Sequence, residues 1–219
     1  ACIQDCLKTI DPGQIAAISF SGHMSATVLI DTDGTPVMPS IMIADTRSRE
    51  QTDMLRSQFL DRFVDMTGNE PLDAFTVSKL LWIQSHCPEK LKRASTLLFP
   101  KDYIRFKLTG KLGTDPSDAG NSLLYHYTDG TWDKELVHEL GLNPDLLPEI
   151  FQSSDSFASV SREAAAQTGL LEGTLVITGA AYMACSQLGT GAFRAGTLAV
   201  TLSTSAQVVL KVPAIAPEL

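Results

Sequence analysis

Three residues near the N-terminus, His23, Met24 and Ser25, lie in the segment 21–25 that directly follows the short apolar run 15–20, and they are candidates for ligand binding. Such a run predicts a buried strand. In an open α/β sheet, ligands bind beyond the carboxyl ends of the strands, which is where these side chains would lie. Position alone leaves a structural alternative equally open: a loop whose small residues turn the chain, with His23 as a hydrogen-bonded structural residue.

Asp45 and Arg47 stand in the same relation to a second apolar run, 36–43. A carboxylate accepts hydrogen bonds and a guanidinium donates them, so the pair suits a ligand with several hydroxyl groups. The structural alternative is a helix N-cap, because a helical pattern begins near Arg47 and an aspartate there would satisfy its first backbone N–H groups.

A third candidate is the turn Ser203, Thr204 and Ser205, which separates the apolar runs 197–202 and 207–212. Hydroxyls and successive backbone N–H groups in such a turn can hold an anion. The same residues more commonly form a plain hairpin turn with no binding role.

The elements that must position these residues alternate between strand-like and helix-like patterns. Together they predict an α/β fold in which a mixed sheet, with an antiparallel hairpin at one side and parallel strands at the other, is flanked by helices. The patterns G-x-G-x-x-G and G-x-x-x-x-G-K-[ST] are absent, which removes sequence support for Rossmann or P-loop nucleotide binding. Predicted strands are 15–20, 27–30, 36–43, 97–99, 174–178, 197–202 and 207–212, and predicted helices are 2–10, 47–64, 76–87, 101–108, 133–140, 161–167 and 181–188.

Composition narrows the class of protein. The 219 residues carry a net charge of −8, which disfavours nucleic acid and membrane surfaces as partners because both are anionic. The four cysteines, Cys2, Cys6, Cys87 and Cys185, form no C-x-x-C pair and have no metal-ligand spacing to a histidine, so we expect no metal site and mostly buried, reduced thiols in a cytoplasmic protein.

The ends of the sequence look cut. The chain starts without methionine in what resembles the second half of a helix, 2–10, and stops just after the strand-like run 207–212. We therefore expect a piece of a longer protein. Its truncated sheet would expose an unpaired edge and an apolar face, which favours self-association, for example as a homodimer.

Read together, four segments resemble the FGGY family of carbohydrate kinases, and within it the xylulokinase-type members. Segment 15–48 resembles the family's strand, loop and hairpin that end in a D-x-R element, and 75–84 resembles its K-x-x-W stretch. Segment 97–125 carries the P-K-D-Y, L-T-G and T-D-x-S-D-A elements, and 179–209 resembles the stretch with the catalytic base and a phosphate-binding G-T-S turn. The matches run in order over nearly the whole chain.

The resemblance implies a fold of two ribonuclease-H-like domains, as in actin and hexokinase, with sugar and ATP in the cleft between them. Residues 1–195 would be the N-terminal domain without its first strands, and 196–219 the opening hairpin of the C-terminal nucleotide-binding domain. The implied function is transfer of the ATP γ-phosphoryl group to a hydroxyl of a small, xylulose-like ketose or a polyol. ATP and Mg²⁺ would bind mainly to parts outside this chain.

The resemblance also assigns residues. His23, Met24, Ser25, Asp45 and Arg47 would form the sugar-binding side. Two of these depart from the family pattern, since His23 replaces a glutamine and Ser25 replaces the histidine of an M-H pair.

The phosphate-binding turn would be Ser203, Thr204 and Ser205, without the family's first glycine.

Tyr182 occupies the position of the catalytic aspartate. A phenol, whose ordinary pKa is about 10, is a poor base at neutral pH. Two interpretations follow: a kinase whose pocket and base have been rebuilt, or a catalytically impaired, kinase-like protein with a sugar-binding or regulatory role. A hydrolase has little support, because no G-x-S-x-G motif and no placed acidic pair are present.

Overall fold

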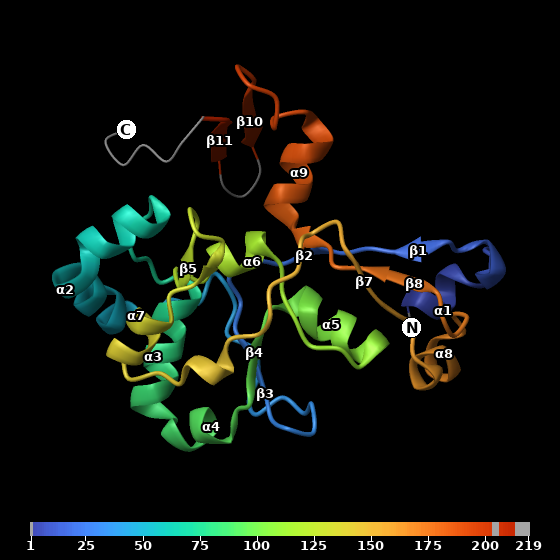
Figure 1. Ribbon diagram of the computed structural model, residues 1–219, viewed down its shortest axis with the longest axis horizontal. Helices are drawn as coiled ribbons and strands as arrows, with labels where there is room; N and C mark the ends of the chain where they lie inside the picture. The colour runs from blue at the N-terminus through green and yellow to red at the C-terminus, as the bar shows by residue number, and fades with distance from the viewer. Residues whose placement is uncertain (1, 203–205, 213–219) are drawn as a thin grey trace.

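The computed structural model describes residues 2–202 and 206–212, shown as a ribbon in Figure 1. Each helix that the apolar periodicity predicts is present, with ends shifted by a few residues. The helices are α1 (Cys2–Cys6), α2 (Arg49–Thr67), α3 (Thr76–His86), α4 (Pro88–Arg93), α5 (Pro100–Thr109), α6 (Pro116–Gly120), α7 (Lys134–Glu139), α8 (Arg162–Thr168) and α9 (Tyr182–Thr190), with the 3-10 turns η1 (Pro12–Gln14) and η2 (Pro144–Leu146). Of these, α4 and α6 are helices that were not predicted.

The strands are short and pair in both directions. They are β1 (Ala17–Ile18), β2 (Ser21–Gly22), β3 (Val28–Ile30), β4 (Thr96–Leu98), β5 (Tyr125–His126), β6 (Thr131–Trp132), β7 (Ser156–Ser159), β8 (Leu175–Ile177), β9 (Ala180–Ala181), β10 (Leu198–Leu202) and β11 (Ala206–Leu210). Strand β8 pairs in parallel with β1 and antiparallel with β7, and β2 pairs in parallel with β9. The remaining pairs, β3–β4, β5–β6 and β10–β11, are antiparallel.

The molecule is elongated, and α5 and α6 lie at its centre (Figure 1). On one side, α2, α3, α4 and α7 enclose the largest apolar cluster, which includes Leu55, Phe63 and Leu80. On the other side, β1, β7 and β8 lie with α1 and α8, and a second cluster forms around Val176. The central helices therefore sit between two separate cores.

The predicted hairpin of 27–30 and 36–43 forms only in part. Isolated bridges join Thr27 to Ile41 and Ile30 to Pro36, but the second run is not a strand. The ladder partner of β3 is instead β4, in the register Leu29 to Leu97. Prolines within the second run lack the N–H that a continuous ladder needs.

Between residues 111 and 160, helix 133–140 was the one element predicted from the sequence. The structure confirms that helix as α7 and adds α6, the β5–β6 pair and β7. These elements escaped the periodicity argument because they are two to five residues long, too short to show a repeat.

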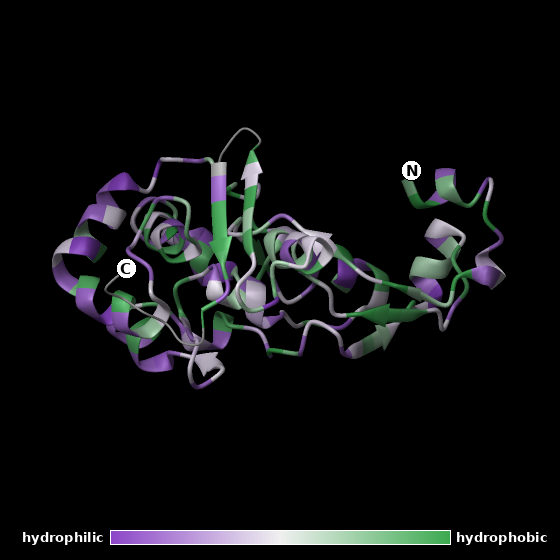
Figure 2. Cartoon of the chain, turned by 90° about the horizontal axis from the view of Figure 1, so that it is seen from above, coloured by the Kyte–Doolittle hydropathy of each residue, from purple (hydrophilic) through white to green (hydrophobic). Residues whose placement is uncertain are grey.

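The hairpin β10–β11 lies beside α9 (Figure 1), and most of its apolar side chains are exposed. Leu202 and Val208 are 79% and 69% exposed. The two strands are largely green, the colour of apolar residues, in the hydropathy view of Figure 2, and Leu198, Val200 and Leu210 are also more than half exposed. The apolar face predicted from the sequence was that of the truncated sheet, whereas this exposed face belongs to a separate two-stranded sheet.

Two smaller findings concern the cysteines and the membrane. All four cysteines are free, but Cys2 and Cys6 are exposed while Cys87 and Cys185 are half-buried, so the prediction of mostly buried thiols is wrong. Along the described ranges, no helix has the length and apolar character to cross a bilayer.

Candidate functional site

His23 and Tyr182, which are 159 positions apart in the sequence, come together because β2 and β9 are parallel neighbours. The register pairs Gly22 with Ala181, so the next residue of each segment leaves the sheet at the same edge. The rings of His23 and Tyr182 are stacked, with centroids 6.5 Å apart and planes 24° apart. The carboxyl ends of parallel strands thus form the edge that the sequence predicted as a ligand crevice.

Gly179 allows this approach. Its φ is +76°, a left-handed conformation that favours glycine, and a Cβ there would lie 2.6 Å from the backbone oxygen of Phe20. Any larger residue would push β9 away from β2. Tyr182 then opens α9 with 39% of its surface exposed, and the Nε2 atom of His23 is buried without a hydrogen-bond partner among the described residues.

The segment after β2 is held by a buried lysine. Ser25 has a φ of +59°, which is uncommon outside glycine, and Lys79 Nζ donates hydrogen bonds to the carbonyls of Ser25 at 2.7 Å and Ala74 at 2.5 Å. Burial lowers the pKa of Lys79 to about 8, although Asp45 and Asp73 oppose this shift. Lys79 thereby fixes a strained backbone in the predicted sugar-binding segment.

Asp45 and Arg47 form a bidentate ion pair. Asp45 Oδ1 accepts from Arg47 Nε at 2.8 Å and from its backbone N–H at 3.0 Å, and Oδ2 accepts from Nη2 at 2.7 Å. These hydrogen bonds hold the pKa of Asp45 below its ordinary value and raise that of Arg47. Helix α2 begins at Arg49 with Ser48 as its N-cap, so the alternative of Asp45 as a helix cap is wrong.

Helix α3 links the two parts of the candidate site. Lys79 contacts Ser25, and Trp82, three residues later on the same helix, lies under the Arg47 guanidinium at 4.9 Å from the ring centroid. Residues three apart share a helix face, so one face of α3 supports both the loop after β2 and the Asp45–Arg47 pair. The sequence pattern K-x-x-W marked these two residues, but gave them no role.

The remaining predicted residues are placed as follows. Met24 is half-buried beside His23 in the chain, and Ser25 is buried. Ser203, Thr204 and Ser205 lie outside the described residues. In the described part of the chain, no three His, Cys, Asp or Glu side chains are placed to hold a metal ion.

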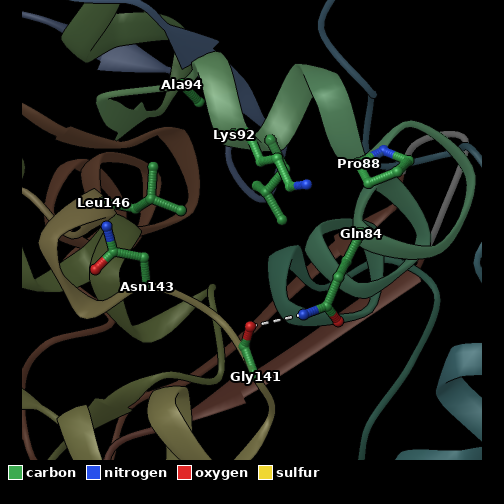
Figure 3. Close-up of a pocket in the computed structure, with 8 residues that line it drawn as sticks. Gln84, Pro88, Lys92, Ala94, Gly141, Asn143 and Leu146 are labelled. Atoms are coloured by element: carbon green, nitrogen blue, oxygen red, sulfur yellow. Dashed lines mark hydrogen bonds between the residues drawn. The ribbon is translucent and has the colours of Figure 1, made fainter.

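Two hollows border these elements. One, of about 310 Å³, lies between the loop that carries Asp45 and the start of α2, with Thr46, Arg49 and Asp73 in its lining. The other, of about 330 Å³, lies between α3, α4 and the segment after α7, where Gln84 Nε2 donates to the carbonyl of Gly141 at 2.7 Å (Figure 3). None of the predicted site residues that the structure describes lines either hollow.

Comparison with known proteins gives one consistent result. A family model of the FGGY family of carbohydrate kinases, N-terminal domain, matches residues 1–189. The xylulose kinase of Bacillus subtilis is 36% identical over 91% of this chain and 40% of its own length. The autoinducer-2 kinase of Salmonella typhimurium is 30% identical over 97% of this chain and 41% of its own length.

Among solved structures, the crystal structure of xylulose kinase from Rhodospirillum rubrum matches with a TM-score of 0.90 and 27% identity, and covers 95% of this chain and 43% of that chain. This similarity confirms the predicted actin- and hexokinase-like fold class. The chain spans about two fifths of the length of the curated relatives it matches.

Proposed function

The chain belongs to the FGGY family of carbohydrate kinases, and we propose that it carries mainly the sugar-binding side of an enzyme that transfers the ATP γ-phosphoryl group to a sugar hydroxyl. The observation that supports this most is the parallel β2–β9 register, which brings His23 of the proposed sugar loop beside Tyr182, the residue that we propose stands in the position of the family's base. In such transfers the protein mainly positions the reactants and stabilises charge.

The proposed substrate is a small ketose such as xylulose, or a polyol. Xylulose kinases recur among the relatives, and one relative is named for a different substrate, as an autoinducer-2 kinase, so we keep acceptors other than xylulose in the proposal. The Asp45 carboxylate would accept hydrogen bonds from sugar hydroxyls and the Arg47 guanidinium would donate them. Both side chains remain partly exposed, at 24% and 43%, so both are accessible to a ligand.

We further propose that residues 1–195 form the N-terminal domain and that 196–219 open a second, nucleotide-binding domain. The exposed apolar side chains of β10 and β11 would then pack inside that domain. ATP and Mg²⁺ would bind mainly outside the described residues, and we assign none of these to the metal because no suitable cluster of side chains is present among them.

Because Tyr182 stands at the proposed base position, we consider a second candidate function: the protein binds a sugar but transfers the phosphoryl group poorly. A base within reach of the acceptor hydroxyl typically contributes about 10²–10⁴-fold to the rate. A neutral phenol donates a hydrogen bond but is a weak proton acceptor at neutral pH. Phosphoryl transfer with a loose transition state needs less help from a base, which favours a slow kinase over an inactive one.

The full-length gene product tests both candidates. Calorimetric titration with D-xylulose, other ketoses and polyols measures binding, and sugar-dependent ADP release measures transfer. A kinase binds one of these sugars and releases ADP with it, whereas a sugar-binding relative binds without release. Absence of binding to every sugar in the panel would refute both candidates.

A further inference from the structure

Five charged side chains between α5 and α6 are buried and take no part in the candidate sugar site. Each is at most 3% exposed. We call them the buried ionic cluster; they are Lys101, Asp102, Arg105, Asp115 and Asp118.

Lys101 is the centre of the buried ionic cluster. Its Nζ lies 2.5 Å from Asp102 Oδ1, 2.9 Å from Asp115 Oδ1 and 3.0 Å from Asp118 Oδ2. Arg105 Nη2 also contacts Asp102 Oδ1, at 3.0 Å. Removing charges from water costs several kcal/mol per ion, so apolar side chains of the same volume would give a fold at least as stable. Stability alone therefore does not explain the cluster.

The cluster reaches the start of α9 through Ser117. The Ser117 hydroxyl donates to Asp115 Oδ2 at 2.5 Å and accepts a hydrogen bond from the backbone N–H of Ala181 at 2.8 Å. Ala181 directly precedes Tyr182 and is the N-cap of α9, where no side chain of its own caps the helix. Arg105 Nη1 donates to the carbonyl of Thr178, in the segment that leads into β9.

The cluster also supports β2. The methylene groups of Lys101 pack on Gly22, where an added Cβ would lie 2.4 Å from Lys101 Cβ. Both segments that bring His23 and Tyr182 together therefore rest on the same buried group of charges. Because the interior is close-packed, a shift of the cluster would move the strand ends with it.

We propose that Ser117, oriented by Asp115, is a positioning residue that fixes the start of α9 and with it the side chain at position 182 relative to the acceptor hydroxyl. This inference rests on the proposed function of the chain as the sugar side of a kinase. Ser117 touches no substrate; it acts through the Ala181 N–H. A misplacement of about 1 Å at a reacting centre can lower a rate by about 10²-fold.

Ser117→Ala in the full-length gene product tests the proposal, with Ser153→Ala as the matched control. Ser153 Oγ donates to the same Asp115 Oδ2 at 2.7 Å and to nothing else among the described residues. In the Tyr182→Asp background, where position 182 carries a good proton acceptor, we expect Ser117→Ala to lower kcat roughly tenfold or more with the sugar KM changed less than about twofold, because it disturbs position 182 and not the sugar contacts. Ser117→Thr, which retains the hydroxyl, should restore kcat, and Ser153→Ala should leave it unchanged.

Hydrogen–deuterium exchange at the Ala181 amide supplies a readout that does not depend on activity. Exchange should be at least about tenfold faster in Ser117→Ala than in the wild type and unchanged in Ser153→Ala, because only the first variant frees this N–H. Equal exchange in both variants, or equal kcat, would overturn the proposal. If the wild type phosphorylates no sugar, the proposed function fails, and the exchange at Ala181 alone decides whether Ser117 holds this position.

Discussion

Replacement of Asp45 by alanine separates a sugar-binding role from a structural one. The substitution removes the carboxylate that accepts two side-chain hydrogen bonds from Arg47. It leaves the start of α2 intact, because Ser48 and not Asp45 is the N-cap of that helix. We therefore expect a loss of sugar affinity with little loss of stability.

The magnitudes follow from exposure and chemistry. The Asp45–Arg47 pair is partly open to solvent, with side chains 24% and 43% exposed, and pairs of this kind contribute about 0–1 kcal/mol to the free energy of unfolding. A hydrogen bond between a sugar hydroxyl and a charged acceptor contributes about 1.5–3 kcal/mol. Asp45→Ala should thus weaken sugar binding about 10- to 150-fold, since each 1.4 kcal/mol is about tenfold.

Calorimetric titration of sugar into the full-length gene product measures the affinity, and thermal unfolding measures stability. Asp31→Ala is the matched control, because Asp31 Oδ2 accepts from Arg93 Nη2 at 3.0 Å and Oδ1 accepts backbone N–H groups of its turn, in a pair outside the candidate site. Asp31→Ala should change stability by a similar amount and leave sugar affinity unaltered. Unchanged affinity in Asp45→Ala with a clearly lower melting temperature would refute the reasoning.

Three further substitutions probe the supports of the site. Lys79→Met should weaken sugar binding more than it changes kcat, measured as a raised KM, because it frees the left-handed backbone at Ser25; an unchanged KM would contradict this. Burial raises the pKa of Asp118 from 3.8 to about 7. Between these two pH values the folded state holds a proton that the unfolded chain releases. The stability that this group contributes is therefore lost as the pH rises from about 4 through 7. Asp118→Asn should flatten that loss in urea unfolding at pH 5 and pH 7.5, and an unaltered pH dependence would argue against it. Gly22→Ala should lower the free energy of unfolding by about 1–3 kcal/mol or more, because its Cβ would overlap the Lys101 side chain. If the variant unfolds at the same urea concentration as the wild type, the Lys101 side chain moves aside without cost and this expectation is wrong.

The long helices and the position of the candidate crevice could be predicted from the sequence. The apolar pattern 47–64 predicted α2 within three residues at each end, and Gly68 ends it with a φ of +69°. The segment after the first apolar run was also predicted to lie at a strand end, although its first two residues form the short strand β2 (Ser21–Gly22) and not a loop. The local sequence pattern is enough to predict these helices, because helix capping and the helical period depend on residues that are close together in the sequence.

The contacts that assemble the site could not be predicted in this way. The stacking of His23 on Tyr182 depends on the register of β2 and β9, two strands of two residues each that lie far apart in sequence. The hydrogen bond from Lys79 to Ser25 spans 54 positions. Such pairings are set by tertiary packing, which leaves no period in the sequence.

The buried ionic cluster shows the same limit. In the sequence, its lysine and aspartates could be identified only as parts of family motifs, because a lysine and three aspartates in a polar stretch ordinarily indicate a solvated surface. Burial reverses that interpretation, and it becomes visible only when α5 and α6 are packed against β2 and β9.

The most direct test of the account is the rate of sugar-dependent ADP release by the full-length gene product and its Tyr182→Asp variant, with folding of both checked by circular dichroism. If residue 182 lies beside the acceptor hydroxyl, as we propose, the wild type should turn over slowly and the aspartate, as a better proton acceptor, should raise kcat by up to about 10²–10⁴-fold. A wild type that already turns over at about 1–100 s⁻¹, the ordinary range of kinases, and that is slowed by the aspartate would contradict the assignment of this position.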